Sequence, residues 1–197
     1  MAIKLASIFF TMILVDNYVL AKFLGICPFL GVSKKLDSAV GMSLAVTFVM
    51  VMATAATWPL YMGILAPNGL EYLQTIVFIL VIAILVQLLE NFLKKFIPAL
   101  YKSLGVYLPL ITTNCTILGV TILNLDNGYS FPESIVCAAG AGIGFLVAMV
   151  LFSGVRRKVE QAIVPECFKG LPITLVAAAM TSLSFMGFAG LAENMFK

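Results

Sequence analysis

The sequence predicts an all-α integral membrane protein with six transmembrane helices, arranged as two inverted three-helix repeats in which helices one and four are broken. Three observations predict this fold. Of the 197 residues, 62% are hydrophobic and only 11% are charged, with a mean hydropathy of +1.10. Long stretches of the chain carry no charge, and the basic residues gather in alternate loops. A soluble domain carries about 25% charged residues, so water is not the solvent for most of this surface.

Uncharged runs mark five of the six expected spans, and these runs cover residues 38–70, 72–89, 103–125, 134–155 and 170–192. The sixth span lies within residues 3–33, where Asp16 and Lys22 interrupt an otherwise apolar segment. About 20 apolar residues form a helix long enough to cross the hydrocarbon core of a bilayer. We therefore expect a single membrane domain over residues 1–197, whose first segment is kept as a span and is not removed as a signal peptide.

The charged residues between the spans predict the orientation of the chain. Nine of the twelve basic residues fall in the loops after spans one, three and five, and these are Lys34, Lys35, Lys94, Lys95, Lys102, Arg156, Arg157, Lys158 and Lys169. The loops around residues 67–71 and 126–133 contain acidic residues and no Lys or Arg. Cytoplasmic loops carry the excess of basic residues, so both termini are expected outside the cytoplasm.

Two pairs of similar segments indicate an internal repeat. Residues 20–26 read L-A-K-F-L-G-I and residues 100–106 read L-Y-K-S-L-G-V; residues 27–32 read C-P-F-L-G-V and residues 115–120 read C-T-I-L-G-V. The repeats would span residues 1–97 and 98–197, with three helices each. Because three is an odd number, the second copy would cross the membrane upside down, an architecture in which the working site commonly lies at broken helices near the midplane.

Residues that disfavour helix fall in both matching segments. The expected interruptions are Gly25, Pro28 and Gly31 in span one, and Gly105, Pro109 and Gly119 in span four. Proline removes a backbone donor and clashes with the preceding turn. Irregular backbone is tolerated at membrane depth only against protein or a cavity, so we expect these two segments to face the interior.

Each broken segment carries one cysteine, Cys27 and Cys115, at equivalent positions of the repeat. Three interpretations are open at this point: small apolar packing residues, a disulfide, or a pair of thiolates for a soft metal or an iron–sulfur cluster. The other two cysteines have no counterpart in the repeat. Cys137 lies in the glycine-rich segment V-C-A-A-G-A-G-I-G-F, where small residues let helices approach closely, and Cys167 lies in a basic loop; we expect both to be structural.

Several classes of function lack their residues in this chain. There is no histidine, which excludes bis-histidine haem ligation. There is no glycine-rich phosphate loop or dinucleotide fingerprint, and no nucleic-acid partner is expected. Charged residues in spans tend to be paired or functional. Asp16 is such a residue. The i, i+4 spacing of Glu90 and Lys94 allows an ion pair, but a solvated helix end is the favoured interpretation there; the roles of both acids stay open.

The cysteine segments resemble those of a known family. F-L-G-I-C-P-F-L-G-V-S-K-K at 23–35 and L-G-V-Y-L-P-L-I-T-T-N-C-T-I-L-G-V at 104–120 are similar to the A subunits of Rnf electron-transport complexes. The segments V-I-A-I-L-V-Q-L-L-E at 81–90 and F-M-G-F-A-G-L at 185–191 are similar as well, and the resemblance covers the whole chain. The E subunit of the sodium-pumping NADH:quinone reductase shares the architecture; Pro28 after Cys27 favours the Rnf family.

The resemblance implies a component of a bacterial inner-membrane translocase, not catalytic alone, that moves electrons between ferredoxin and NAD with Na⁺ or H⁺ translocation. It implies that Cys27 and Cys115 ligate a [2Fe–2S] cluster, with the other two thiolates from a homologous six-span partner, the Rnf E subunit. The B, C, D and G subunits would be further partners. Thr113 and Asn114, beside Cys115, would then be candidates for hydrogen bonding around the sulfur.

Two interpretations from other classes remain. Inverted repeats and broken helices also fit a secondary transporter, which would hold a substrate site within this chain and no iron. A membrane scaffold that only anchors redox partners would tolerate Cys→Ser changes at both positions.

Overall fold

The computed structural model describes residues 2–33, 36–96, 108–162 and 164–195, and within these residues the regular structure is entirely helical. The first half comprises α1 (Ala2–Leu14), α2 (Ile26–Val32), α3 (Leu36–Leu60) and α4 (Gln74–Phe96). The second half comprises α6 (Leu108–Thr112), α7 (Cys115–Asp126), α8 (Phe131–Glu160) and α9 (Leu171–Met195). Short helical turns lie at Tyr61–Leu65, Glu71–Leu73 and Glu166–Phe168.

Three long apolar helical segments are consistent with an integral membrane protein. Leu36–Leu65, Glu71–Phe92 and Phe131–Glu160 are long and apolar enough to cross a bilayer. Two shorter apolar helical segments, Lys4–Leu14 and Leu171–Gly187, were found among the described residues. Three of the six predicted spans therefore correspond to helices of sufficient length. The other three spans stay a prediction.

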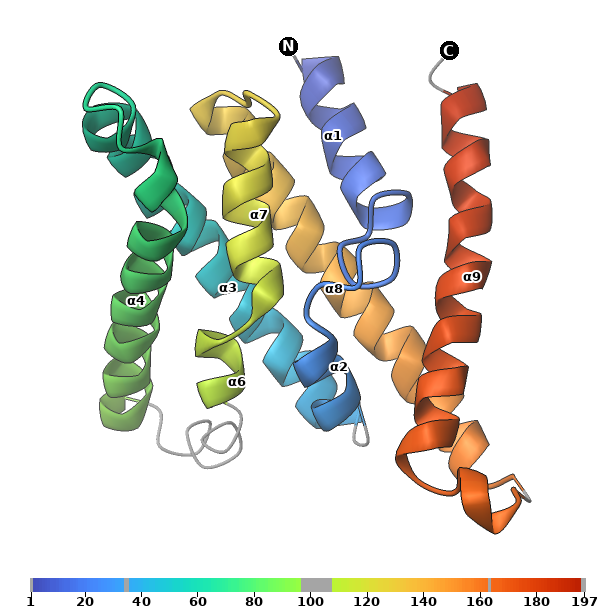
Figure 1. The fold of residues 1–197 in the computed structure, drawn as a ribbon. Helices are drawn as coiled ribbons and strands as arrows, with labels where there is room; N and C mark the ends of the chain where they lie inside the picture. Colours follow the sequence, from blue (N-terminus) through green and yellow to red (C-terminus); the bar gives the residue numbers. More distant parts are fainter. Residues whose placement is uncertain (1, 34–35, 97–107, 163, 196–197) are drawn as a thin grey trace.

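The helices α3 and α8 cross at the centre of the bundle and make its most extensive contact (Figure 1). α1 packs along α8, α7 packs on α3, and α4 and α9 lie at opposite flanks. α1 begins and α9 ends at the same end of the bundle, which we call the acidic end because the loops around 67–71 and 126–133 lie there. α2, α4 and α8 finish at the other end, called here the basic end.

Close packing at the centre depends on the glycines of α8, as the small-residue pattern predicts. A Cβ atom on Gly140 would lie 3.1 Å from the backbone oxygen of Phe9, and one on Gly144 would lie 3.0 Å from that of Met12. Towards α3, a Cβ on Gly142 would meet the side chain of Thr47 at 2.4 Å. Because these positions carry no side chains, the backbone of α8 can approach α1 and α3 closely. In a bilayer the hydrophobic effect does not drive helices together, so these van der Waals contacts stabilise the packing.

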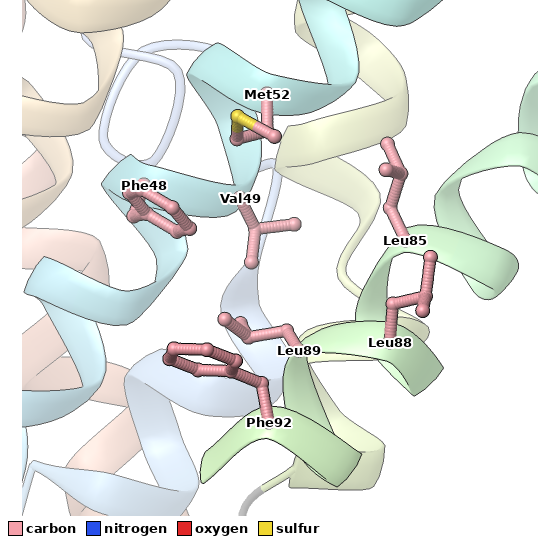
Figure 2. Close-up of a pocket in the computed structure, with 7 residues that line it drawn as sticks. All are labelled: Phe48, Val49, Met52, Leu85, Leu88, Leu89 and Phe92. Atoms are coloured by element: carbon pink, nitrogen blue, oxygen red, sulfur yellow. The ribbon is translucent and has the colours of Figure 1, made fainter. Parts of the chain in front are cut away.

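The α4 helix leaves a different kind of space against α3. An apolar cavity of about 370 Å³ separates the two helices (Figure 2), and its wall is formed by Phe48, Val49, Met52, Leu85, Leu88, Leu89 and Phe92. All seven side chains are hydrocarbon, aromatic or thioether. The cavity therefore offers no donor, acceptor or charge for chemistry, and we do not consider it a functional site.

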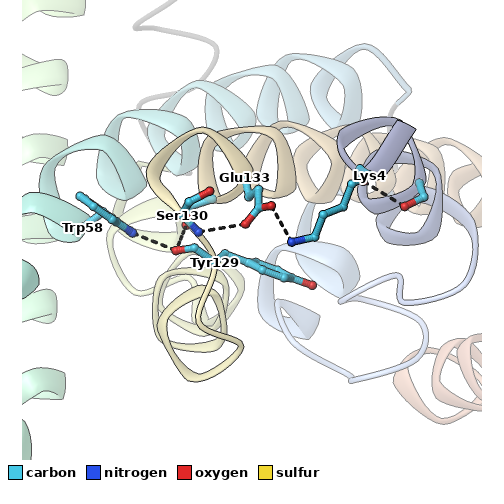
Figure 3. A network of polar contacts seen from close by, with 7 residues as sticks. Lys4, Trp58, Tyr129, Ser130 and Glu133 are labelled. Carbon is cyan, nitrogen blue, oxygen red and sulfur yellow. Dashed lines mark hydrogen bonds and ion pairs between the residues drawn. The ribbon is translucent and has the colours of Figure 1, made fainter. Parts of the chain in front are cut away.

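Polar contacts at the acidic end join α1, α3 and the start of α8 (Figure 3). Lys4 Nζ lies 2.7 Å from Glu133 Oε1, and the Ser130 backbone N–H donates to Glu133 Oε2 at 3.0 Å. Ser130 and Glu133 form a capping box at the first turn of α8, which satisfies N–H groups that have no partner within the helix. The indole N–H of Trp58 donates to the Tyr129 carbonyl at 3.1 Å.

Candidate functional site

The first break follows α1, and a buried asparagine shapes it. The Asn17 side chain, 1% exposed, donates to the carbonyl of Gly144 at 2.8 Å and to that of Ile13 at 3.3 Å. Its Oδ1 accepts from the backbone N–H of Val19 at 3.0 Å. Buried backbone groups need hydrogen-bond partners. The Asn17 side-chain amide supplies them where the helical hydrogen bonds of α1 end.

The break ends in left-handed backbone. Phe23 has φ 56° and Gly25 has φ 79°, and α2 begins at the next residue, Ile26. Cys27 is the second residue of α2, and its thiol is free and exposed.

The predicted interruption of span one is confirmed, but two of its three residues were assigned wrongly. Gly25 lies at the break, whereas Pro28 and Gly31 lie inside α2. Pro28 is the third residue of that helix, within the first turn, where its missing N–H has no intrahelical partner to lose. The proline therefore fits the start of a helix and does not break one.

The second break separates α6 from α7 at Thr113 and Asn114. Asn114 caps α7, because its Oδ1 accepts from the backbone N–H of Thr116 at 3.0 Å. Cys115 is the first residue of α7, and its thiol is also free and exposed. The break thus starts a helix with an N-cap asparagine, one of the preferred residues at that position.

The expected breakers of span four need the same correction. Pro109 is the second residue of α6, and Gly119 lies inside α7. Gly105 lies outside the described residues. Sequence reasoning located the broken segment correctly and missed that the polar run before Cys115 makes the break.

The structure brings the two breaks into direct contact. A Cβ atom on Gly25 would lie 2.1 Å from Thr116 Oγ1 and 3.1 Å from Asn114 Oδ1. A Cβ on Gly119 would likewise lie 2.7 Å from a methyl carbon of Leu24. The residues before Cys27 therefore pack on the residues that flank Cys115, although these segments are far apart in the sequence.

Thr113 and Asn114 differ in how they face the site. The Thr113 hydroxyl donates to the Pro109 carbonyl at 3.0 Å, and the Cys115 sulfur lies 4.0 Å from the Thr113 carbonyl oxygen. Asn114 is 4% exposed, and its Nδ2 group has no hydrogen-bond partner among the described residues. Cys115, Thr113 and Asn114 also line a cavity of about 320 Å³ against α4. A role for either residue around the sulfur stays a prediction.

Arg156 is a residue of this site that sequence reasoning missed. It was grouped with the basic residues of a loop, but its side chain is only 10% exposed. Its guanidinium donates to the Leu30 carbonyl and, at 2.8 Å, to the Ser33 hydroxyl. One turn earlier on α8, Phe152 stacks on Phe29 with ring centroids 4.2 Å apart.

α8 therefore holds the second half of α2, through Phe29, Leu30 and Ser33. Arg156 places a positive charge and donors at the carbonyl end of α2, which is the favourable end for a cation. α2 has seven residues, so it is about 10 Å long and the position of Cys27 is coupled to this contact. The i, i+4 spacing of Phe152 and Arg156 in the sequence indicates that both side chains lie on one face of α8. On the other side, the Ser182 hydroxyl of α9 donates to the Leu20 carbonyl of the first break.

The remaining candidates lie away from the two breaks or lack a partner. Cys137 is fully buried in α8, in agreement with a packing role, and Cys167 is exposed in the turn Glu166–Phe168. Among the described residues, no ion pair joins Glu90 to Lys94, and the role of Glu90 stays open. No group of three His, Cys, Asp or Glu residues gathers within the described part of the chain.

Comparison with known proteins adds an independent observation. A family model described as Rnf-Nqr subunit, membrane protein, matches residues 5–192. The chain belongs to this Rnf-Nqr family. The match covers both broken segments, so the two cysteine positions lie within the family domain.

Relatives within the Rnf-Nqr family agree with the resemblance noted in the sequence. The chain is 56% identical to the A subunit of the ion-translocating oxidoreductase complex of Syntrophotalea carbinolica over 179 residues, which cover 91% of this chain and 93% of the relative. It is 53% identical to the A subunit of the Na⁺-translocating ferredoxin:NAD⁺ oxidoreductase complex of Acetobacterium woodii over 187 residues, or 95% and 97% of the two chains. The corresponding protein of Aliivibrio salmonicida is 51% identical over 181 residues, 92% of this chain and 94% of the relative. The assignment to the A subunits of Rnf-type complexes is thus confirmed.

Proposed function

We propose that this chain is the membrane component of an Rnf-type ferredoxin:NAD oxidoreductase complex that conducts electrons across the bilayer, coupled to the translocation of Na⁺ or H⁺. The names of its relatives support the complex and the coupling. Within this chain, Cys27 and Cys115 would supply two thiolates to a [2Fe–2S] cluster. The other two thiolates would come from a homologous partner, the Rnf E subunit, in a complex that also contains the B, C, D and G subunits.

The contact between the two breaks carries this proposal. Gly25 lies against Asn114 and Thr116, so the residues adjoining the two cysteines are neighbours in the fold. Both thiols are free and exposed, as ligands shared with a second chain would be before that chain is present. Four thiolates are the usual complement of such a cluster, and this chain brings two to the breaks.

The chain's own residues fit thiolate ligands. Each cysteine lies in the first turn of its helix, beside the break that precedes it. When bound, the cluster supplies one-electron transfer between carriers on the two membrane faces. Asn17 and Asn114 hold the two breaks in place, and Arg156 holds the end of α2 that follows the first break.

The membrane arrangement is part of the same proposal. We infer six spans in an inner-membrane protein, formed by repeats at 1–97 and 98–197 and with both termini outside the cytoplasm. The start of α1 and the end of α9 at one end of the bundle support an even number of crossings (Figure 1). The equivalent places of α3 and α8, each the third α-helix described in its half and crossing the other at the centre, support the repeat.

Cysteine variants of the intact complex test the cluster. We expect Cys27→Ser and Cys115→Ser each to abolish the reduced-state EPR signal of the membrane cluster and ferredoxin-dependent NAD reduction. The matched controls Cys137→Ala and Cys167→Ala remove thiols for which no ligand role is proposed, and both should keep the signal. An intact signal in the Cys27→Ser complex would contradict the assignment.

The sharing of ligands is tested by expression of the chain with and without its homologous partner, followed by iron and sulfide analysis. Stoichiometric iron is expected only when the two are expressed together. A full cluster in the isolated chain would contradict the shared site. The Cys27→Ser and Cys115→Ser variants would still test whether these two cysteines are ligands.

A further inference from the structure

A polar cavity of about 330 Å³ lies at the basic end, where α8 meets the start of α9. Arg156, Glu160, Lys169 and Thr174 are among the residues that line it. The carboxylate of Glu160 is already engaged, because its Oε1 accepts from Arg156 Nε at 3.3 Å. Likewise the Thr174 hydroxyl donates to the Gly170 carbonyl at 2.9 Å. The ammonium of Lys169 is the least restrained polar group of this wall.

Lys169 is available to a ligand. Its Nζ lies 3.7 Å from Glu166 Oε1, but the two side chains are 64% and 95% exposed. Such an exposed ion pair contributes about 0–1 kcal/mol and is readily exchanged. The segment from 156 to 169 carries four basic residues, Arg156, Arg157, Lys158 and Lys169, and two acidic ones, Glu160 and Glu166. Of these, Arg156, Lys169 and Glu160 line the cavity, so its wall is net positive and complements an anion.

An apolar groove of about 370 Å³ adjoins the cavity, and Val159 lines both. On α8, Leu151 and Val155 continue the groove away from the basic end, at successive turns of the helix. On α9, Ala177 and Met180 form the facing wall. The groove follows the seam where the two helices diverge towards the acidic end (Figure 1).

The two hydroxyls of the groove do not make it polar. Thr181 donates to the Ala177 carbonyl at 2.8 Å and Ser184 donates to the Met180 carbonyl at 3.0 Å. With these donors satisfied inside α9, the surface offered to a ligand is hydrocarbon. A positive cavity at a helix end joined to a hydrocarbon groove of membrane depth matches the two chemically distinct parts of a phospholipid.

We propose that the α8–α9 seam binds an anionic phospholipid, with its phosphate-bearing headgroup in the Arg156–Lys169 cavity and an acyl chain along the groove. The lipid would fill the space between two helices that touch mainly near the basic end. This site shares Arg156 with the support of α2, but it contains neither Cys27 nor Cys115 and does not depend on the cluster.

Lipid retention in the purified complex tests the proposal. The complex is reconstituted into nanodiscs of phosphatidylglycerol and phosphatidylcholine, extracted into mild detergent, and examined by native mass spectrometry for bound phosphatidylglycerol. Lys169→Gln removes one charge from the cavity and is expected to lower retention about fivefold. Lys94→Gln removes a charge from the same end of the bundle but away from the seam, and it should leave retention unchanged.

A second pair of variants tests the groove. Val155→Trp fills it at a side chain that is 36% exposed, so the fold is expected to tolerate the change while retention of phosphatidylglycerol falls at least fivefold. Leu44→Trp adds the same bulk at a 58% exposed position of α3 and should have no effect.

Three results would overturn the proposal. Equal retention in wild type and in both seam variants would show that the seam binds no lipid. Displacement of the bound species by inorganic phosphate, with no loss in Val155→Trp, would identify a free-anion site. Loss of another protein component from the Val155→Trp complex at unchanged lipid content would show that a protein helix covers the groove.

Discussion

Gly25 lies so close to Thr116 that a Cβ atom on residue 25 would come within 2.1 Å of the threonine Oγ1. This contact joins the broken segment before Cys27 to the broken segment that starts with Cys115. It also requires two properties of glycine at once, since Gly25 has φ 79° as well as no room for a side chain.

Gly25→Ala is expected to destabilise the protein more than the same change at Gly69. Gly69 has φ 65° and nothing within 4 Å of its Cβ position, so alanine there costs only the left-handed backbone, about 1–2 kcal/mol. At Gly25 the clash with Thr116 adds about 1–3 kcal/mol of overpacking. Unfolding of the purified protein in mixed detergent micelles measures both. Equal losses would mean that the breaks do not pack as described.

Arg156→Gln is expected to loosen α2. The change removes charge-assisted donors from the Leu30 carbonyl and the Ser33 hydroxyl, contacts that contribute about 1.5–3 kcal/mol when the donor is charged. Hydrogen exchange of amides in 26–33 should accelerate, while exchange in the centre of α9 should not. Arg157→Gln is the matched control, because Arg157 is the next residue along α8 and is exposed. Identical exchange in the two variants would rule out the contact between Arg156 and α2.

Glu133 is expected to stabilise the fold more through its hydrogen bond from the Ser130 N–H than through its ion pair with Lys4. Lys4 is 64% exposed on its side chain, so the Lys4–Glu133 pair should be worth less than about 1 kcal/mol. Glu133→Gln keeps an oxygen for the Ser130 N–H and should cost little, whereas Glu133→Ala removes this hydrogen bond of the capping box and should cost about 0.5–1.5 kcal/mol. A double-mutant cycle with Lys4→Met separates the two terms. Equal destabilisation by Gln and Ala would reverse this ranking.

The orientation predicted from the basic loops is expected to appear in reporter fusions. A reporter that is active only outside the cytoplasm should work after Lys197 and fail after Lys158. A reporter that is active only in the cytoplasm should show the opposite pattern. If both positions report the same side, the number of spans between them is even and the six-span topology is wrong.

Much of the architecture was predictable because a bilayer acts on each residue separately. Uncharged length and apolar composition placed the segments that became α3, α4, α8 and α9, since a charge in the hydrocarbon core costs free energy wherever the helix packs. The glycine-rich segment of α8 was predicted as a close-packing surface for the same local reason, that small residues let backbones approach.

The positions of the breaks were predictable only as regions. The sequence predicts breaks at Pro28 and Pro109, but both lie in first turns, where proline is compatible with a helix. Whether a proline starts or interrupts a helix depends on what holds the preceding backbone. At the first break that is Asn17, which reaches Gly144 on a distant helix, and no local pattern specifies such a partner.

The sequence by itself determined a helical membrane protein of the Rnf type, two cysteines in matching segments and the sorting of charge between alternate loops, because these follow from composition, order and spacing along one chain. Only the tertiary structure decided that Gly25 meets Thr116, that Arg156 turns inward onto α2 and that the α8–α9 seam joins a positive cavity to an apolar groove. Each of these depends on which faces of distant helices meet. That choice is made by close packing of the whole bundle, to which every helix contributes at once.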